Sequence, residues 1–200
     1  MIENIENIEL QYLTLDDYTA LKQAMIQVYS NIPNAYWKEA HIKSLIDKFP
    51  EGQVVIKIND ELAGCALSIV VNYEDFDKHH TYREITGNYT FNTHTPNGDV
   101  LYGIDIFIKP EYRGLRLGRR LYDYRKELAE RLNLRGIAFG GRIPNYHKYA
   151  QELSPKEYIE KVKRKEIHDP VLNFQMSNDF HPSKVLKGYL EGDEASNEYA

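Results

Sequence analysis

The sequence predicts an α/β domain built on a mixed sheet. Short β-rich runs recur through the first 108 residues, an amphipathic helical stripe follows them, and a short apolar run comes directly after that stripe. A strand, a helix and a second strand in this order form a crossover between parallel strands, whereas consecutive β-rich runs around a tight turn pair antiparallel. A length of 200 residues suits one ordinary domain.

The N-terminal half carries the signals of one strand, two helices and one hairpin. Alternating apolar residues predict the strand, and a capping box predicts the start of the first helix, which would bury Leu21, Met25 and Val28. The expected elements are a strand over 8–12, a helix after Thr14–Asp17, a helix over 37–48, and a hairpin of 53–58 with 62–72 around Asn59-Asp60.

The C-terminal half contains the clearest helix, because apolar residues recur at three- and four-residue spacing. This stripe comprises Leu117, Leu121, Tyr124, Leu128 and Leu132. The other expected elements are a strand over 100–108, a buried strand over 136–140, a helix capped by Ser154–Glu157, a short helix after Asp169-Pro170, and a closing strand over 185–190.

Two segments lie outside this pattern. Residues 73–99 are too long for a simple turn and rich in aromatic side chains, which predicts an ordered insert near an acceptor pocket. Within it, Thr81 and Glu84 can cap a short helix. Residues 191–200 are polar and acidic, and we expect a mobile tail or the start of a linker. The predicted organisation is one domain over 1–190 followed by this tail.

The net charge of −5 is unevenly distributed. Residues 111–166 hold 15 Lys and Arg against 8 Asp and Glu, which is +7, so the rest of the chain carries −12. A basic segment in an acidic chain favours a small anionic ligand over a long nucleic acid, although a solvated helix face explains the charge equally well. We therefore expect no nucleic-acid partner.

Composition indicates a cytoplasmic protein without metal or membrane. Cys65 is the single cysteine, so no internal disulfide can form, and its small apolar neighbours predict a buried thiol without catalytic function. No apolar run approaches the roughly 18–20 residues that span a bilayer, and the first residues do not resemble a signal peptide. Adjacent His79 and His80 lack the spacing of metal ligands, so we predict no metal site.

The segment that carries chemistry follows strand 100–108. It reads Lys-Pro-Glu-Tyr-Arg-Gly-Leu-Arg-Leu-Gly-Arg-Arg over 109–120, which is a strand, a glycine turn and a helix N-terminus. This geometry presents free backbone N–H groups and a positive helix end to an anion such as a pyrophosphate. It is neither a Walker A loop nor the glycine pattern of dinucleotide folds.

The segment resembles the acetyl-CoA loop of the GNAT N-acetyltransferases, which reads Arg/Gln-x-x-Gly-x-Gly/Ala. Arg113 and Gly118 match its ends, and Arg116 replaces the middle glycine. The resemblance implies the GNAT fold, with a mixed, mostly antiparallel central sheet flanked by helices. More narrowly, this loop with segments 140–146 and 169–172 is similar to the GNAT domain that precedes a carbon–nitrogen hydrolase (nitrilase-like) domain in some bacterial bifunctional proteins.

The resemblance also implies which residues bind the co-substrate acetyl-CoA. Pantetheine would lie between strands 100–108 and 136–140, the pyrophosphate on backbone amides of the loop, and the thioester oxygen near the amides of Ile106 and Phe107. The residues assigned to the cofactor are Ile106, Phe107, Ile108, Arg113, Gly114, Leu115, Arg116, Leu117, Gly118, Arg119 and Asn145.

Candidate acid and base residues follow less directly. Asp105 is a charged residue in an apolar strand, which indicates either a general base or an ion pair with a nearby arginine. The acidic position that some family members use as base falls on Tyr102. The tyrosine that many members use as general acid has no counterpart in 174–180, so we take Tyr146 as the substitute.

The expected function is transfer of an acetyl group from acetyl-CoA to a primary amine of a small molecule or peptide, by direct attack in a ternary complex. An alternative is a non-catalytic acyl-CoA-binding or regulatory domain associated with a carbon–nitrogen hydrolase, covalently or functionally. A third reading, a nucleic-acid-binding module, rests only on the basic segment. A homodimer is compatible with the sequence.

Overall fold

The computed structural model describes residues 5–30, 32, 35–76 and 78–200, which form two compact units. The sheet unit comprises residues up to 75 together with 86–139, and the C-terminal unit comprises 76–85 with 140–200. The sequence analysis expected a single domain over 1–190 followed by a tail, whereas the two units separate after residues 75, 85 and 139. The aromatic insert over 73–99 is divided between the two units, because residues 76–85 fold with the C-terminal residues and the rest folds with the sheet unit.

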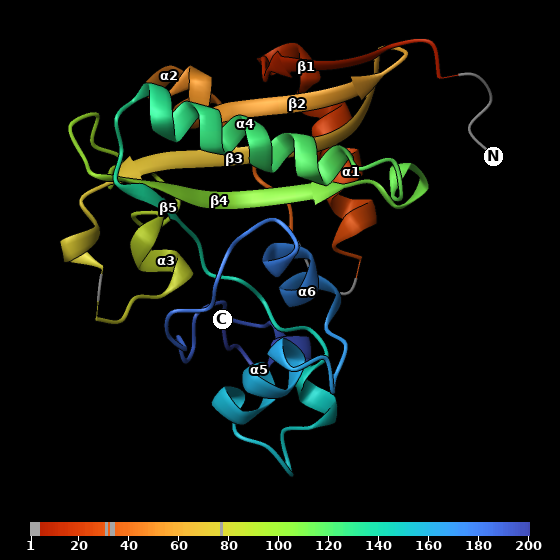
Figure 1. Cartoon of the computed structure of the whole chain (residues 1–200). Coiled ribbons are helices and arrows are strands. Elements are labelled where there is room, and N and C mark those ends of the chain that lie inside the picture. The colour runs from red at the N-terminus through yellow and green to blue at the C-terminus, as the bar shows by residue number, and fades with distance from the viewer. Residues whose placement is uncertain (1–4, 31, 33–34, 77) are drawn as a thin grey trace. The chain divides into compact units, whose positions relative to one another are not determined.

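The sheet unit contains a five-stranded sheet in the order β1–β2–β3–β4–β5 (Figure 1). All neighbours pair antiparallel except β4 and β5, which pair parallel. This confirms the mixed, mostly antiparallel sheet and the crossover. The strands are β1 (Ile8–Tyr12), β2 (Gln53–Ile58), β3 (Glu61–Val71), β4 (Val100–Ile108) and β5 (Gly136–Ala138).

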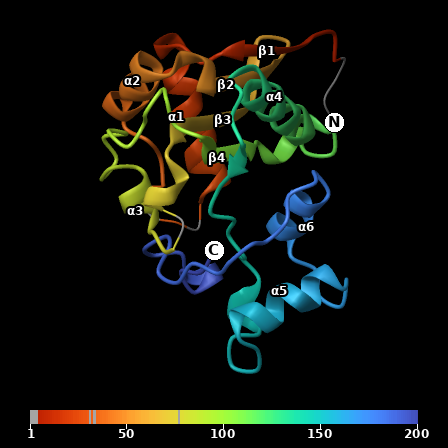
Figure 2. The same cartoon turned by 60° about the vertical axis from the view of Figure 1, so that its left-hand side comes forward.

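Helices cover both faces of this sheet (Figure 2). Helix α4 (Leu117–Arg131) lies on one face, and α1 (Tyr18–Val28) and α2 (Glu39–Lys48) lie on the other. Each was predicted, although α2 begins two residues later than expected. The β2–β3 hairpin is also confirmed: Asn59 and Asp60 both have positive φ angles, 47° and 66°, as a two-residue hairpin turn requires.

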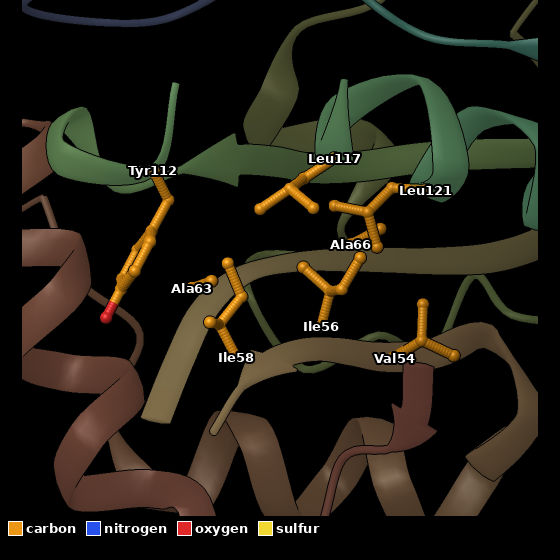
Figure 3. Close-up of a cluster of buried hydrophobic side chains, with 8 residues drawn as sticks. All are labelled: Val54, Ile56, Ile58, Ala63, Ala66, Tyr112, Leu117 and Leu121. Atoms are coloured by element: carbon orange, nitrogen blue, oxygen red, sulfur yellow. The ribbon is translucent and has the colours of Figure 1, made fainter. Parts of the chain in front are cut away.

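The core beneath α4 joins three elements and the loop before the helix. Figure 3 shows Leu117 and Leu121 of α4 directed at apolar side chains of β2 and β3, with Tyr112 at one end. The predicted stripe is therefore confirmed for its first residues, and Leu128 is also fully buried. Leu132 lies beyond the helix and is exposed, whereas Arg125, which the stripe did not include, is only 2% exposed.

The C-terminal unit contains three short helices, α3 (Tyr82–Ile85), α5 (Pro155–Lys163) and α6 (Pro170–Met176). The predicted capping box of α5 is present, because Ser154 and Glu157 each accept a hydrogen bond from the other's backbone N–H. Asp169 caps α6 by accepting from the N–H groups of Val171 and Leu172, each at 3.0 Å. These local signals determine where the helices begin.

The expected closing strand over 185–190 is wrong. This segment is irregular, although Leu186 and Ala200 exchange backbone hydrogen bonds of 2.7 and 3.0 Å and the Tyr189 N–H donates to Glu198. Gly188 has a φ of +64°, which interrupts the extended backbone that a continuous ladder needs. The two segments also pack through Leu186, Tyr189 and Ala200, which share one buried apolar cluster, but they do not form a regular strand.

The acidic tail is part of the C-terminal unit. The Asp193 side chain is 1% exposed and accepts two hydrogen bonds from the Arg142 guanidinium, one of them 2.7 Å from Nε. Ser196 is fully buried and its hydroxyl accepts from the Ile143 N–H at 3.2 Å. Because these contacts join the tail to the loop after Gly141, the tail contributes to the stability of this unit.

Replacing Asp193 with Asn is expected to lower the free energy of unfolding by about 2–3 kcal/mol at pH 7, because it removes the charge of a buried carboxylate that is ion-paired with Arg142. Burial raises the pKa of Asp193, but hydrogen bonds from Arg142 and Ser196 outweigh burial, and the net pKa is lowered. A lowered pKa contributes stability above the unfolded value of 3.8, and this contribution is lost as pH falls below it.

Urea unfolding of the wild type and the Asp193→Asn variant, measured from pH 7 down to pH 2, checks this prediction. The difference between the two proteins should shrink below about pH 4. Glu191→Gln, at an exposed position of the same tail, serves as the control and should leave the midpoint unchanged. Equal midpoints for wild type and Asp193→Asn at pH 7 would contradict the structural role of the tail.

Within the described part of the chain, none of the helices combines the length and the apolar character needed to cross a bilayer.

Candidate active site

The parallel strands β4 and β5 pair over three residues only. Val100, Leu101 and Tyr102 of β4 lie opposite Gly136, Ile137 and Ala138 of β5, and the described ladder contains no β5 partner for Gly103–Ile108. The C-terminal two thirds of β4 therefore have an edge that β5 does not cover. Backbone N–H and C=O groups at such an edge can pair with amide groups of an extended ligand.

The loop that follows β4 leads directly into α4. Gly114 and Arg116 adopt left-handed conformations, with φ angles of 87° and 59°, and α4 begins at Leu117. No side chain of the described residues caps this helix. The first N–H groups of a 15-residue helix are consequently left for another acceptor, and the positive end of its dipole favours an anion.

Charged side chains make the loop more favourable for an anion. Arg113, Arg116 and Arg119 are all exposed, so their guanidinium groups remain accessible to a ligand. Arg119 forms an exposed ion pair with Asp123 at 3.9 Å, and Lys109 forms ion pairs with Glu61 at 2.6 Å and Glu111 at 3.0 Å. The positive field at the start of α4 therefore comes from the arginines and the helix end together.

Arg116 occupies the middle glycine position of the loop motif and keeps the left-handed backbone that a glycine would adopt. Replacing Arg116 with Gly is expected to raise the free energy of unfolding by about 1 kcal/mol, because the left-handed strain of a non-glycine residue is relieved. If the loop binds CoA, as its resemblance to the GNAT loop implies, the variant is also expected to bind CoA about three- to tenfold more weakly, because the loop loses one cation.

Urea unfolding and calorimetric titration with CoA measure the two effects separately. Arg116→Lys is the matched control, because it keeps both the charge and the strained backbone, and it should stay close to the wild type in both measurements. An unchanged CoA affinity in Arg116→Gly would show that the Arg116 side chain does not contact the phosphates.

Strand β4 contains a β-bulge that positions the candidate base. In its pairing with β3, Asp105 lies opposite Leu67, but the next pair is Gly103 with Ser68, so Ile104 is an extra residue. A single inserted residue reverses the side-chain alternation of a strand. The bulge therefore separates β4 into two segments with opposite alternation.

The packing of β4 shows this reversal. Leu101 lies in a core cluster beneath α4, and Ile106, five positions later, also packs on the α4 side. Asp105 and Phe107 point to the opposite face, where both contact Tyr29 at the end of α1. In an unbroken strand, every second side chain lies on the same face. Asp105 and Phe107 would then share the face of Leu101, beneath α4.

The Asp105 carboxylate is partly buried and well supplied with donors. It accepts hydrogen bonds from the Tyr29 hydroxyl, the Trp37 side chain and the Ile106 N–H. Burial raises the pKa of Asp105, and these donors with the nearby Arg125 offset only part of the increase, so the net pKa is raised. A carboxylate with a raised pKa, held by hydrogen bonds, is suited to accept a proton near neutral pH.

The sequence allowed an ion pair as the other interpretation of Asp105. Among the described residues, no arginine forms a salt bridge with its carboxylate; Arg125 instead donates to the Asp105 main-chain oxygen. Arg125 is the functional candidate that the sequence analysis missed. Its position four residues after Leu121, on the buried stripe of α4, was the available signal.

The two remaining site candidates belong to the C-terminal unit. Tyr146 is 4% exposed, its hydroxyl donates to Leu153 at 3.0 Å, and burial raises its pKa. The Asn145 side chain donates to His168 at 3.1 Å and accepts from Lys148 at 2.9 Å. The structure thus brings the loop, Asp105 and 106–108 together in the sheet unit, and groups Asn145 with Tyr146 in the other unit.

The prediction that Cys65 is buried is confirmed. Its side chain is 1% exposed within β3, and burial raises the pKa of the thiol well above its usual range, which makes it a poor nucleophile. Across the described residues, no cluster of three His, Cys, Asp or Glu side chains could hold a metal ion.

Comparison with known proteins identifies relatives of most of this chain. The model of the acetyltransferase (GNAT) family matches residues 18–153. "Probable hydrolase YhcX" of Bacillus subtilis strain 168 is 44% identical over 164 residues, which are 82% of this chain but 32% of that protein. "Uncharacterized N-acetyltransferase YkwB" of the same strain is 37% identical over 161 residues, 80% of this chain and 71% of that protein. The chain thus spans about a third of YhcX.

Solved structures show the same fold. The loading GNATL domain of CurA from Lyngbya majuscula superposes with a TM-score of 0.83 at 22% identity, covering 97% of this chain and 94% of that one. A GNAT-like decarboxylase, GphF, in complex with isobutyryl-CoA gives a TM-score of 0.81 at 18% identity, covering 96% and 95%. At these identities the likeness concerns the fold alone.

Proposed function

Because this chain belongs to the GNAT acetyltransferase family, we propose that it transfers an acetyl group from acetyl-CoA to a primary amine of a small molecule or peptide. The observation that carries the proposal is the left-handed turn at Arg116, which follows the part of β4 that β5 does not pair with and leads into the N-terminus of α4, where the Arg116 side chain makes no capping hydrogen bond. A pyrophosphate and an amide-bearing chain are the two ligand groups that these features suit.

Each part of acetyl-CoA has a proposed binding element. The pyrophosphate accepts from the N–H groups of Leu115–Arg119, with Arg113 and Arg116 as cations, and the pantetheine follows Gly103–Ile108. Main-chain N–H groups of Ile106 and Phe107 stabilise the negative oxygen that forms on the thioester carbon. Asn145 completes the cofactor set in this proposal.

The proposed reaction is direct attack within a ternary complex. The amine nitrogen bonds to the thioester carbon, the tetrahedral intermediate collapses with cleavage of the C–S bond, and the products are an N-acetyl amine and CoA. Asp105 takes the proton that the amine loses, because its raised pKa and its donors hold it as an acceptor. Tyr146 is the proposed donor of the proton that the departing thiolate receives.

The alternative is an acyl-CoA-binding regulatory domain linked to a carbon–nitrogen hydrolase. The similarity to the longer "Probable hydrolase YhcX" favours such a link, and this chain spans 32% of that protein. We propose a cytoplasmic location for both functions. The single cysteine is a free thiol, as is usual in a reducing compartment, and acetyl-CoA is present in the cytoplasm.

Calorimetric titration of the chain with acetyl-CoA and CoA, followed by free-thiol release with a panel of amines, tests the proposal. Micromolar binding and thiol release that depends on an amine are expected. Binding without release from any polyamine, amino acid, aminoglycoside or peptide amine would favour the regulatory alternative. Absence of binding to both ligands would overturn the assignment of the loop.

A further inference from the structure

We propose that Arg125 is a positioning residue, whose buried guanidinium holds the β-bulge of β4 and thereby directs Asp105 to the α1 face of the sheet. The catalytic part of this inference rests on the proposed function, because it treats Asp105 as the base. The structural part concerns the bulge and the Asp105 carboxyl group, and it can be tested without any acyl transfer.

The contacts of Arg125 converge on the bulge. Its Nη2 atom donates to the main-chain oxygens of Leu67, at 2.8 Å, and Asp105, and its Nε donates to the Ser68 hydroxyl at 3.1 Å. Leu67 and Asp105 are the pair next to the extra residue, and Ser68 begins the shifted register. One side chain therefore satisfies carbonyl groups from both strands where the ladder is interrupted.

The surroundings of the guanidinium fit its planar shape. A Cβ atom added to Gly103 would lie 2.9 Å from the Arg125 Nη1 and 3.2 Å from its Cζ, so any larger residue here would force the guanidinium to move. On α4, the Tyr122 ring lies beneath it, with its centroid 5.9 Å from Cζ. Gly103 and Arg125 together make the space in which the bulge forms.

The arrangement is costly for stability alone. Arg125 is 2% exposed, and it donates to the Ser68 hydroxyl and to two main-chain oxygens, all uncharged, so its desolvation is not offset by an ion pair among the described residues. An apolar side chain at this stripe position would avoid that cost. The presence of Arg125 is therefore better explained by its hydrogen bonds at the β4 bulge than by a contribution to core stability.

Arg125 also acts on the charge of Asp105. The groups that face Asp105 are Tyr29 from α1, Trp37, Cys65 from β3 and Arg125 from α4. Arg125 is the cation among these described groups, and it lowers the Asp105 pKa, opposing burial. Loss of Arg125 should consequently raise the pH at which Asp105 becomes an acceptor, in addition to loosening the bulge.

The test compares wild type, Arg125→Met, Arg125→Lys and Gly103→Ala. Arg125→Met removes the charge and the donors, Arg125→Lys keeps the charge without the planar fork, and Gly103→Ala keeps Arg125 but crowds it. Arg131→Met, on the exposed last turn of the same helix, is the matched control. The carboxyl pKa of Asp105 is followed by carbon-13 NMR of Asp-labelled protein, with Asp105→Asn identifying the signal.

For Arg125→Met we expect the Asp105 carboxyl titration to move upward by about one pH unit. We expect kcat to fall about tenfold or more, the KM for acetyl-CoA to change by less than about threefold, and the acidic limb of the kcat profile to follow the NMR titration. In Arg125→Lys, the Asp105 pKa should lie close to the wild-type value, but kcat should remain below that of the wild type. In Gly103→Ala, the loss of kcat should be smaller than in Arg125→Met.

An unchanged Asp105 titration and pH profile in Arg125→Met would overturn the inference, even if its melting temperature fell. A shifted titration in a protein in which Asp105→Asn remains fully active would instead contradict the proposed base and leave the role of Arg125 in the bulge intact. If Arg125→Met does not fold, Arg125→Lys and Gly103→Ala decide the question by the same two readouts.

Discussion

Replacing Asp105 with Asn is expected to lower kcat by about a hundredfold or more and to remove the acidic limb of the kcat/KM profile, with little change in acetyl-CoA affinity. Asn keeps the size of the side chain and still accepts from the Tyr29 hydroxyl, but it cannot take the proton of the amine. Thiol release measured against pH, with affinity from calorimetric titration, gives both quantities.

Tyr29→Phe is the matched control for this variant. It leaves the carboxyl group but removes a donor that favours its charged form, so the Asp105 pKa should rise and activity should appear at higher pH, without a hundredfold loss at its optimum. An unchanged pH profile in Asp105→Asn would exclude Asp105 as the base.

Stability separates a chemical effect from damage to the fold. The folded-state pKa of Asp105 is raised by burial, so in the wild type its ionisation costs stability as pH rises from the unfolded value of 3.8 through the folded pKa. Asp105→Asn removes this cost. The variant should therefore unfold at no lower urea concentration than the wild type at pH 7.

Replacing Gly118 with Glu is expected to weaken CoA and acetyl-CoA binding by about a hundredfold or more, because a carboxylate would stand in the first turn of α4 against the pyrophosphate. Gly118 is the second residue of the helix, in the turn whose N–H groups the proposal assigns to the pyrophosphate. Calorimetric titration with both ligands measures the loss.

Gly118→Gln is the control, because it adds the same bulk without the charge. It should bind CoA more tightly than Gly118→Glu. The ratio of the two affinities measures how much of the loss is caused by the negative charge. Circular dichroism establishes that both are folded. CoA affinity retained in the glutamate variant would remove the loop at 113–119 from the cofactor site.

Local signals allowed the sequence to predict most of the elements. Asn59-Asp60 predicted the hairpin turn, and the Ser154–Glu157 capping box predicted the start of α5, because both depend on residues within a few positions of one another. The loop before α4 was found for the same reason: the Arg113–Gly118 motif, the turn and the helix start are contiguous.

The failures involve contacts between distant residues. The segment over 185–190 has an apolar pattern typical of a strand, but its backbone partners at 198–200 are few and Gly188 interrupts it. Arg125 was passed over because a charged residue on a helix is ordinarily solvated, and only its contacts with Leu67 and Asp105 show otherwise.

The sequence by itself determined the order of the sheet's strands and helices, the crossover and the position of the loop before α4, because turn residues, caps and hydrophobic periodicity act over short distances. The tertiary structure decided which face of the sheet Asp105 occupies. That choice depends on one extra residue in β4 and on Arg125, which lies 20 positions later in the chain. A one-residue shift reverses a whole strand, so alternation within β4 could not predict it.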